Sequence, residues 1–155
     1  MNWLKIQTEI LKVFFKVACG IATNNIFWYE NSEYMQICTD NHILYKIPLE
    51  VWVLNVKKFD IPPSEGMVKM WNRKYSESER LINLNTITSR VINGKTVYLQ
   101  VFRIRDEVDI YVDTKLLKNF PVDECTFYGT GANDMVFIEW NGRLVAGVLP
   151  VKVPK

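Results

Sequence analysis

The residue best suited to acid–base chemistry is His42, the only histidine in the chain. It follows Thr39 and Asp40, so a carboxylate and a hydroxyl lie close to the imidazole in sequence. A Ser-His-Asp triad, a histidine metal site or a histidine general base would each have to use this one residue. We interpret His42 as a turn or pocket residue. An enzyme of unknown class, using His42 with Asp40, is the alternative.

Other groups that often carry chemistry lack the necessary spacing. The segment 129–134 contains Gly-Thr-Gly without the third glycine and following helix of a dinucleotide-binding motif, and no phosphate-binding loop occurs. Asp106, Glu107 and Asp109 cluster, but strand alternation would place them on opposite faces. We therefore expect no catalytic residue and no cofactor.

The three cysteines, Cys19, Cys38 and Cys125, are odd in number and far apart. They fit neither a disulfide framework nor a thiolate zinc site, and we interpret them as free thiols in a reducing cytoplasm, with no metal site.

A stripe of positive charge is the one candidate surface for a polyanion. Lys5, Lys12 and Lys16 recur at helical spacing within an apolar pattern, which places them along one helix face. They could track the phosphates of duplex DNA without sequence preference. The alternative is the solvated face of an amphipathic helix.

The elements that carry these residues alternate between helices and short strands. Apolar periodicity predicts a helix over 3–18 that Gly20 ends, and a hairpin of 26–29 with 34–38. Asn93-Gly94 and Asn141-Gly142 predict two further hairpin turns. Further strands are expected at 43–47, 86–92, 96–105, 108–112, 125–128, 135–140 and 143–153, and a short helix at 115–119. The run 51–56 could be strand or buried helix, and 57–80 reads as a long excursion with a short helix.

Composition limits the class of protein. The 155 residues are 48% hydrophobic, which indicates one globular α+β domain spanning 1–155. The net charge of +2 excludes the strong positive field of an obligate nucleic-acid binder. Charged residues interrupt the apolar N-terminus, so we expect neither a secretion signal nor a membrane span, and a cytoplasmic location.

Two segments resemble the bacterial DNA polymerase sliding clamps, or β clamps. Residues 39–44 read Thr-Asp-Asn-His-Ile-Leu, which is similar to the T-D-G-H-R-L turn of that family. Residues 147–153 read Gly-Val-Leu-Pro-Val-Lys-Val, which is similar to the clamp C-terminus, V-V-M-P-M-R-L. Asn41 stands in place of a glycine and Ile43 in place of an arginine.

The resemblance implies one clamp-like domain: two helix-plus-antiparallel-strand halves, with the helices on one face of the sheets and an insertion within 57–100. In the family, three such domains form each subunit, inner helices line a DNA channel, and partner proteins insert a short peptide into an apolar pocket. The pocket positions carried over are Thr39, Asp40, His42, Leu44, Leu149, Pro150, Val151 and Lys152. In the family these two groups come from adjacent domains, so a single-domain chain would complete the pocket only between copies. The resemblance also implies that Lys5, Lys12 and Lys16, with Lys115 and Lys118 of the short helix, face the phosphates of duplex DNA.

The resemblance therefore implies a non-catalytic, sliding-clamp-like module that acts in DNA replication, with a phage or mobile element as the expected source. Its expected partners are peptide motifs of replication or repair proteins, duplex DNA and further copies of itself, with no membrane. An α+β protein-interaction adaptor that does not bind DNA is the alternative.

Overall fold

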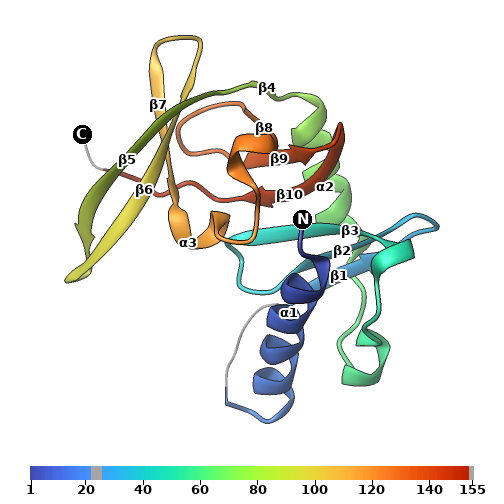
Figure 1. Ribbon diagram of the computed structural model, residues 1–155. Coiled ribbons are helices and arrows are strands. Elements are labelled where there is room, and N and C mark those ends of the chain that lie inside the picture. The colour runs from blue at the N-terminus through green and yellow to red at the C-terminus, as the bar shows by residue number, and fades with distance from the viewer. Residues whose placement is uncertain (22–25, 154–155) are drawn as a thin grey trace. The chain divides into compact units, whose positions relative to one another are not determined.

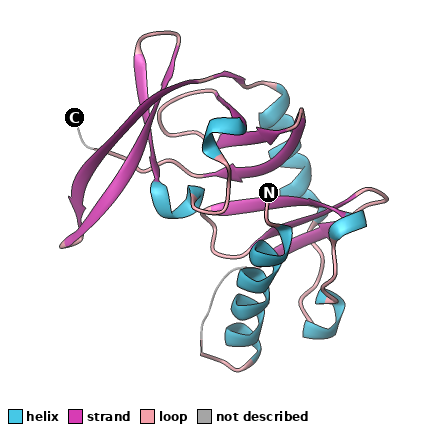
Figure 2. Ribbon diagram, in the orientation of Figure 1, coloured by secondary structure: helices cyan, strands magenta, loops and turns pink. Residues whose placement is uncertain are grey.

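The computed structural model describes residues 1–21 and 26–153 (Figure 1). The chain divides into two compact units, Met1–Lys74 and Tyr75–Lys155, which are described one at a time. The described residues contain three α-helices and two kinds of further element, antiparallel strands and short 3-10 turns, joined by the loops that Figure 2 colours pink. The expected α+β class is confirmed.

The N-terminal unit begins with helix α1, Trp3–Ala18, at the predicted residues. Its start is capped by Asn2, whose side-chain oxygen accepts a hydrogen bond from the backbone N–H of Lys5 at 3.0 Å. The buried stripe is Ile6, Ile10 and Phe14, each at most 1% exposed. Gly20 follows with φ +69°, the left-handed conformation that ends many helices.

Three antiparallel strands follow: β1, Phe27–Glu30; β2, Tyr34–Cys38; and β3, Ile43–Pro48. The turn between β1 and β2 forms because the side-chain oxygen of Asn31 accepts hydrogen bonds from the backbone N–H groups of Glu33 and Tyr34. The predicted hairpin and third strand are thereby confirmed. The first residue of the predicted hairpin, Ile26, immediately precedes β1.

Residues 51–56 form neither the predicted strand nor a buried helix. Val51 ends one 3-10 turn, Leu49–Val51, and Val56 begins another, Val56–Phe59, with residues 52–55 between them outside regular structure. The side chain of Gln7, only 1% exposed, donates to the carbonyl of Val51 and accepts from the N–H of Val53, both at 2.8 Å. A side chain on α1 therefore supplies the backbone partners that a strand would have supplied.

The excursion at 57–80 contains a helix, as expected. Trp28 of β1 anchors the connecting loop, because its indole N–H donates to the carbonyl of Ile61 at 2.7 Å. Helix α2 then spans Glu65–Ser76 and buries Val68 and Trp71. It is longer than the short helix that the sequence suggested.

In the C-terminal unit, one group of antiparallel strands is ordered β10-β9-β8-β4. The strands are β4, Glu79–Arg80; β8, Cys125–Gly129; β9, Val136–Trp140; and β10, Arg143–Val148. Asn141 and Gly142 link β9 to β10 with φ of 51° and 71°, as the predicted Asn-Gly turn requires. Tyr75 donates from its hydroxyl to Glu139 of β9 at 2.6 Å.

The second sheet of this unit has the order β5-β6-β7. Its strands are β5, Ile82–Ile92; β6, Lys95–Ile104; and β7, Val108–Asp113. Asn93 and Gly94, with φ of 50° and 75°, form the predicted turn between β5 and β6. Helix α3, Thr114–Leu117, follows β7, and the side chain of Asp113 caps it. Phe102 packs against Phe127 of β8 with ring centroids 4.5 Å apart.

The last strand is shorter than predicted. We expected it to run to Val153, but β10 ends at Val148, two residues before Pro150. Proline has no backbone N–H, so it cannot continue a ladder as a donor. The chain beyond it turns to the other sheet instead, where the N–H of Val151 donates to the carbonyl of Tyr111 in β7 at 2.7 Å.

Candidate peptide-binding site

The C-terminal unit contains a pocket of about 490 Å³ beside strand β7. One wall is Tyr111 with Val108 of β7, and another is Val151 with Val153 of the C-terminal segment. The loop between β8 and β9 contributes Ala132 and Asn133 to the lining. This volume lies within the range of about 300–1,000 Å³ that is typical of ligand sites.

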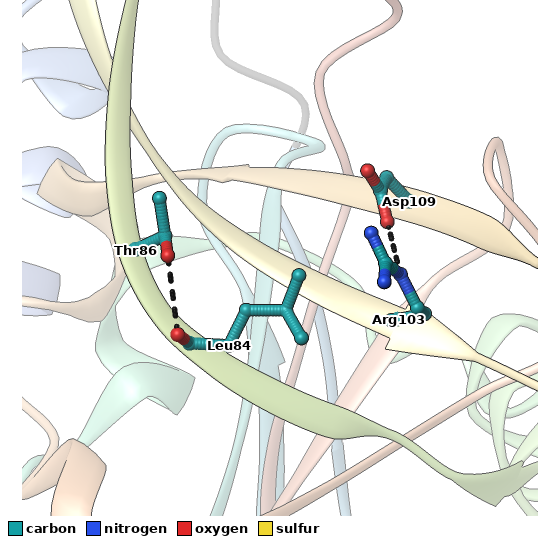
Figure 3. Close-up of polar contacts among 4 residues, drawn as sticks. All are labelled: Leu84, Thr86, Arg103 and Asp109. Atoms are coloured by element: carbon teal, nitrogen blue, oxygen red, sulfur yellow. Dashed lines mark hydrogen bonds and ion pairs between the residues drawn. The ribbon is translucent and has the colours of Figure 1, made fainter. Parts of the chain in front are cut away.

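Charged side chains also line this pocket. Arg90 comes from β5, Glu107 from the turn before β7, and Asp109 from β7 itself. The carboxylate of Asp109 is bound by Arg103 of β6, whose Nε lies 2.7 Å from Oδ1. Figure 3 shows these two side chains pointing toward each other from neighbouring strands. Arg90 and Glu107 thus remain as the charged groups of opposite sign in the pocket lining.

The Arg103–Asp109 pair follows from the strand register. These two residues lie directly opposite each other in the β6–β7 ladder, where side chains of one face meet. The hydrogen bond from the guanidinium to the carboxylate raises the pKa of Arg103. Because both side chains are about one-third exposed, at 37% and 34%, the pair fixes geometry more than it adds stability.

A bulge in β5 precedes the regular segment that carries Arg90. The register against β6 shifts between Asn83 and Thr86, and Asn85 between them has φ +52°. The side-chain oxygen of Asn83 accepts from the N–H of Asn85 at 3.0 Å and from Gln100 at 2.7 Å. The hydroxyl of Thr86 donates to the carbonyl of Leu84 at 3.1 Å (Figure 3). The regular part of β5 therefore starts at Thr86.

The first group of predicted pocket residues lies in the N-terminal unit. Thr39 and Leu44 are buried, at 5% and 7% exposed, whereas His42 is exposed. Oδ1 of Asp40 accepts from the backbone N–H groups of His42 and Ile43, at 2.9 and 3.2 Å. The carboxylate therefore stabilises the turn through backbone groups, and these contacts do not involve the imidazole.

Asn41 occupies the position where the family turn has glycine, and its φ is +64°. Asparagine is one of the few residues besides glycine that adopts this conformation readily. The turn shape therefore tolerates the difference between this chain and the family motif.

The second group of predicted pocket residues lies in the C-terminal unit. Leu149, Pro150 and Val151 are half-buried, and Lys152 is exposed. Of these four, Val151 lines the pocket beside β7. The prediction from the sequence thus includes one residue of the observed pocket wall.

The predicted DNA-binding lysines are also divided between the N-terminal and the C-terminal unit. Lys5, Lys12 and Lys16 are all exposed on α1 and, at 3.6 residues per turn, project within about 40° of one another. Lys115 and Lys118 are exposed in the C-terminal unit. Since α3 ends at Leu117, Lys118 forms its C-terminal cap.

In the two cysteines that are at least partly buried, Cys38 and Cys125, the environment disfavours the thiolate form. Burial raises the pKa of the Cys38 thiol, and burial followed by the charge of Glu124 raises the pKa of Cys125 to about 11. Among residues 1–21 and 26–153, no group of three or more metal-ligating side chains occurs. No helix in the same ranges is both long and apolar enough to cross a membrane.

Sequence reasoning missed most of the pocket. It expected no catalytic role for the carboxylates Asp106, Glu107 and Asp109 and gave no role to Arg90 or Tyr111. The usable signal was the alternation of β7, which places Asp109 and Tyr111 on one face. What the sequence could not supply is the C-terminal segment that returns to β7 and forms the opposite wall.

Comparison with known protein families, curated proteins and solved structures finds no match to this chain.

Proposed function

We propose that the chain is a non-catalytic, sliding-clamp-like binding module that holds a short peptide of a partner protein in the pocket beside β7. The observation that carries the proposal is the pocket of about 490 Å³, with valine and tyrosine walls and charged Arg90 and Glu107 in its lining. Peptide sites commonly combine an apolar pocket for one side chain with nearby polar groups that fix orientation.

The backbone of β7 supports a peptide over a compact small molecule. The carbonyl of Tyr111 accepts the N–H of Val151 at 2.7 Å, so this strand edge already pairs with an extended segment. In an antiparallel ladder, backbone groups alternate in direction, so those of Asp109, two residues away, point to the same side. A peptide can pair with the backbone groups of Asp109 in the same way.

The resemblance of residues 147–153 to the clamp C-terminus supports the same function, because in that family this strand forms part of the peptide pocket. The expected ligands are accordingly motifs of replication or repair proteins. Of the two carboxylates in the pocket lining, Asp109 is bound by Arg103, whereas Glu107 is not. We therefore expect Glu107 to bind a basic residue of the peptide, next to an apolar residue that contacts the valine and tyrosine walls.

Selection from a library of short random peptides tests this function. We expect enriched peptides to bind the native chain and to bind the Val151→Asp variant at least about tenfold more weakly, a change of about 1.4 kcal/mol. Val53→Asp is the matched control, because Val53 is 67% exposed in the N-terminal unit. Circular dichroism verifies that both variants fold. Absence of enrichment, or equal binding by Val151→Asp, would contradict the proposal.

A second candidate function is duplex DNA binding by α1. The observation in its favour is the exposure of Lys5, Lys12 and Lys16 along one face of a regular 16-residue helix. Each phosphate that a lysine neutralises releases a counterion, so three contacts predict a slope of log affinity against log salt of about −2.7. If the chain is instead a protein-interaction adaptor that does not bind DNA, we expect no measurable affinity for the duplex at any salt concentration.

Fluorescence anisotropy of a labelled duplex distinguishes these two. The triple change of Lys5, Lys12 and Lys16 to Glu should abolish binding at low salt. The matched control reverses the same number of exposed lysines elsewhere, at Lys58, Lys95 and Lys152. If both triple variants lose the same amount of DNA affinity, the effect comes from net charge and not from α1. If the native chain does not bind the duplex at low salt, the proposed DNA function is wrong.

A further inference from the structure

Strand β5 leaves one edge of its sheet open. Among the described strands, β5 pairs with β6 alone and lies at the end of the order β5-β6-β7. Apolar side chains along this ribbon are exposed, with Ile87 at 61%, Val91 at 74% and Tyr98 at 58%. Open edges are usually protected by charges or proline, yet β5 carries one charged residue in eleven, Arg90.

The two-residue turn identifies which backbone groups of β5 are unpaired. Ile92 and Lys95 close the hairpin and therefore form a hydrogen-bonded pair. Counting back from Ile92 in steps of two, the backbone N–H and C=O groups of Arg90, Thr88 and Thr86 also point toward β6. Those of Ile87, Ser89 and Val91 point away from the sheet, into the open edge.

We propose that two copies of the chain associate through antiparallel pairing of their β5 edges, with the twofold axis at Ser89. This register places Ile87 opposite Val91 of the second copy and Ser89 opposite its own counterpart. All three outward-facing residues then exchange both backbone hydrogen bonds, and the exposed Ile87 and Val91 side chains meet on one face. The strand is complementary to itself, which is why a second copy fits better than an unrelated peptide.

Neighbouring registers fit less well. A shift of two residues in one direction brings Asn85, with φ +52°, into the ladder, and a shift in the other direction brings in Asn93, with φ +50°. Both residues depart from extended geometry. The symmetric register is thus the one that uses the whole regular segment 86–92.

The charge on this strand is compatible with the pairing. Arg90 lies on the opposite face from Ile87 and Val91 and meets Thr88 of the second copy, so no like charges are directly opposed. Its guanidinium donates to the carbonyl of Ser89 at 3.2 Å on the surface. In the dimer, the carbonyl of Ser89 accepts a hydrogen bond from the backbone N–H of Ser89 of the second copy, in place of the bond from the Arg90 guanidinium.

Disulfide trapping tests the register. Directly opposed residues have Cα atoms about 5.5 Å apart, within the range of a disulfide. Ser89→Cys should therefore cross-link into a dimer under mild oxidation. Ile87→Cys is the matched control, because the two copies of residue 87 would lie about 13 Å apart along the strands. Both variants carry Cys19→Ser, since Cys19 is exposed.

Sedimentation equilibrium tests the association itself. We expect the native chain to reach twice its 18.2 kDa mass at high concentration. The double variant Ile87→Lys, Val91→Lys should be monomeric. The control Ile82→Lys, on the same strand but outside the segment 86–92, should still form the dimer. A native chain that stays monomeric, or Ile87→Cys cross-linking as well as Ser89→Cys, would overturn the proposal. The peptide pocket would remain testable in the monomer.

Discussion

The side chain of Gln7 holds the segment 51–53 against α1, and replacing it should lower stability strongly. Gln7 is 1% exposed and makes two hydrogen bonds of 2.8 Å, to the carbonyl of Val51 and from the N–H of Val53. Gln7→Met keeps a long unbranched side chain but removes both polar partners. Two backbone groups then lose the hydrogen bonds that they make in the native chain.

The expected loss can be worked out from these two bonds. A buried polar group without a partner costs about 1–3 kcal/mol, so two would give about 2–6 kcal/mol. Water can reach part of this segment, because Val53 is 67% exposed, which favours the lower part of the range, about 2–4 kcal/mol. Domains of this size are stable by about 5–15 kcal/mol, so the variant should fold with a reduced margin.

Urea unfolding followed by circular dichroism measures this change. With a slope of about 2 kcal/mol per molar, a loss of 2 kcal/mol shifts the midpoint down by about 1 M. Thr8→Ala is the control on the same helix, because the exposed Thr8 hydroxyl donates to the carbonyl of Leu4 of α1 itself. We expect it to change stability by less than about 0.5 kcal/mol. Equal midpoints for Gln7→Met and the native chain would refute the reasoning.

The further predictions concern three single side chains. Because the pKa of Cys125 is raised from 9.0 to about 11, native Cys125 should react with iodoacetamide at pH 8 about a hundredfold more slowly than in urea, as measured by mass spectrometry. The same raised pKa stabilises the fold below pH 9, and this contribution should be lost as pH rises from about 9 through 11. Tyr75→Phe removes the 2.6 Å hydrogen bond to Glu139 and should lower the free energy of unfolding by about 1.5 kcal/mol in urea melts; no change would show that the bond adds nothing. Asp40→Ala should cost about 1 kcal/mol, whereas Asp40→Asn, which keeps the acceptor for His42 N–H, should cost less; the reverse order would contradict the turn-stabilising role.

Local chemistry explains which parts of the fold could be predicted. Asn93-Gly94 and Asn141-Gly142 determine their turns through residues that accept positive φ, and α1 is specified by its own apolar period and Gly20. Residues 51–56 could not be assigned, because Gln7, more than forty positions away in sequence, provides their hydrogen bonds. Apolar content alone does not distinguish such a segment from a strand.

The same reasoning explains what was missed in the site. The resemblance of residues 147–153 to a family motif placed Val151 among the candidate residues. It did not predict the contact of Val151 with Tyr111, which depends on where the chain turns after Pro150. Arg90 is brought to the pocket by a strand whose regular register starts after a bulge. Both features arise from long-range pairing, which residue spacing does not encode directly.

Nuclear magnetic resonance of the ¹⁵N-labelled chain, titrated with a selected peptide, tests the central claim most directly. The proposed function predicts saturable shifts in the backbone amides of Asp109, Tyr111 and Val151, with no comparable change at His42. Shifts confined to residues 39–44, or the same shifts in the Val151→Asp variant, would contradict a peptide site beside β7.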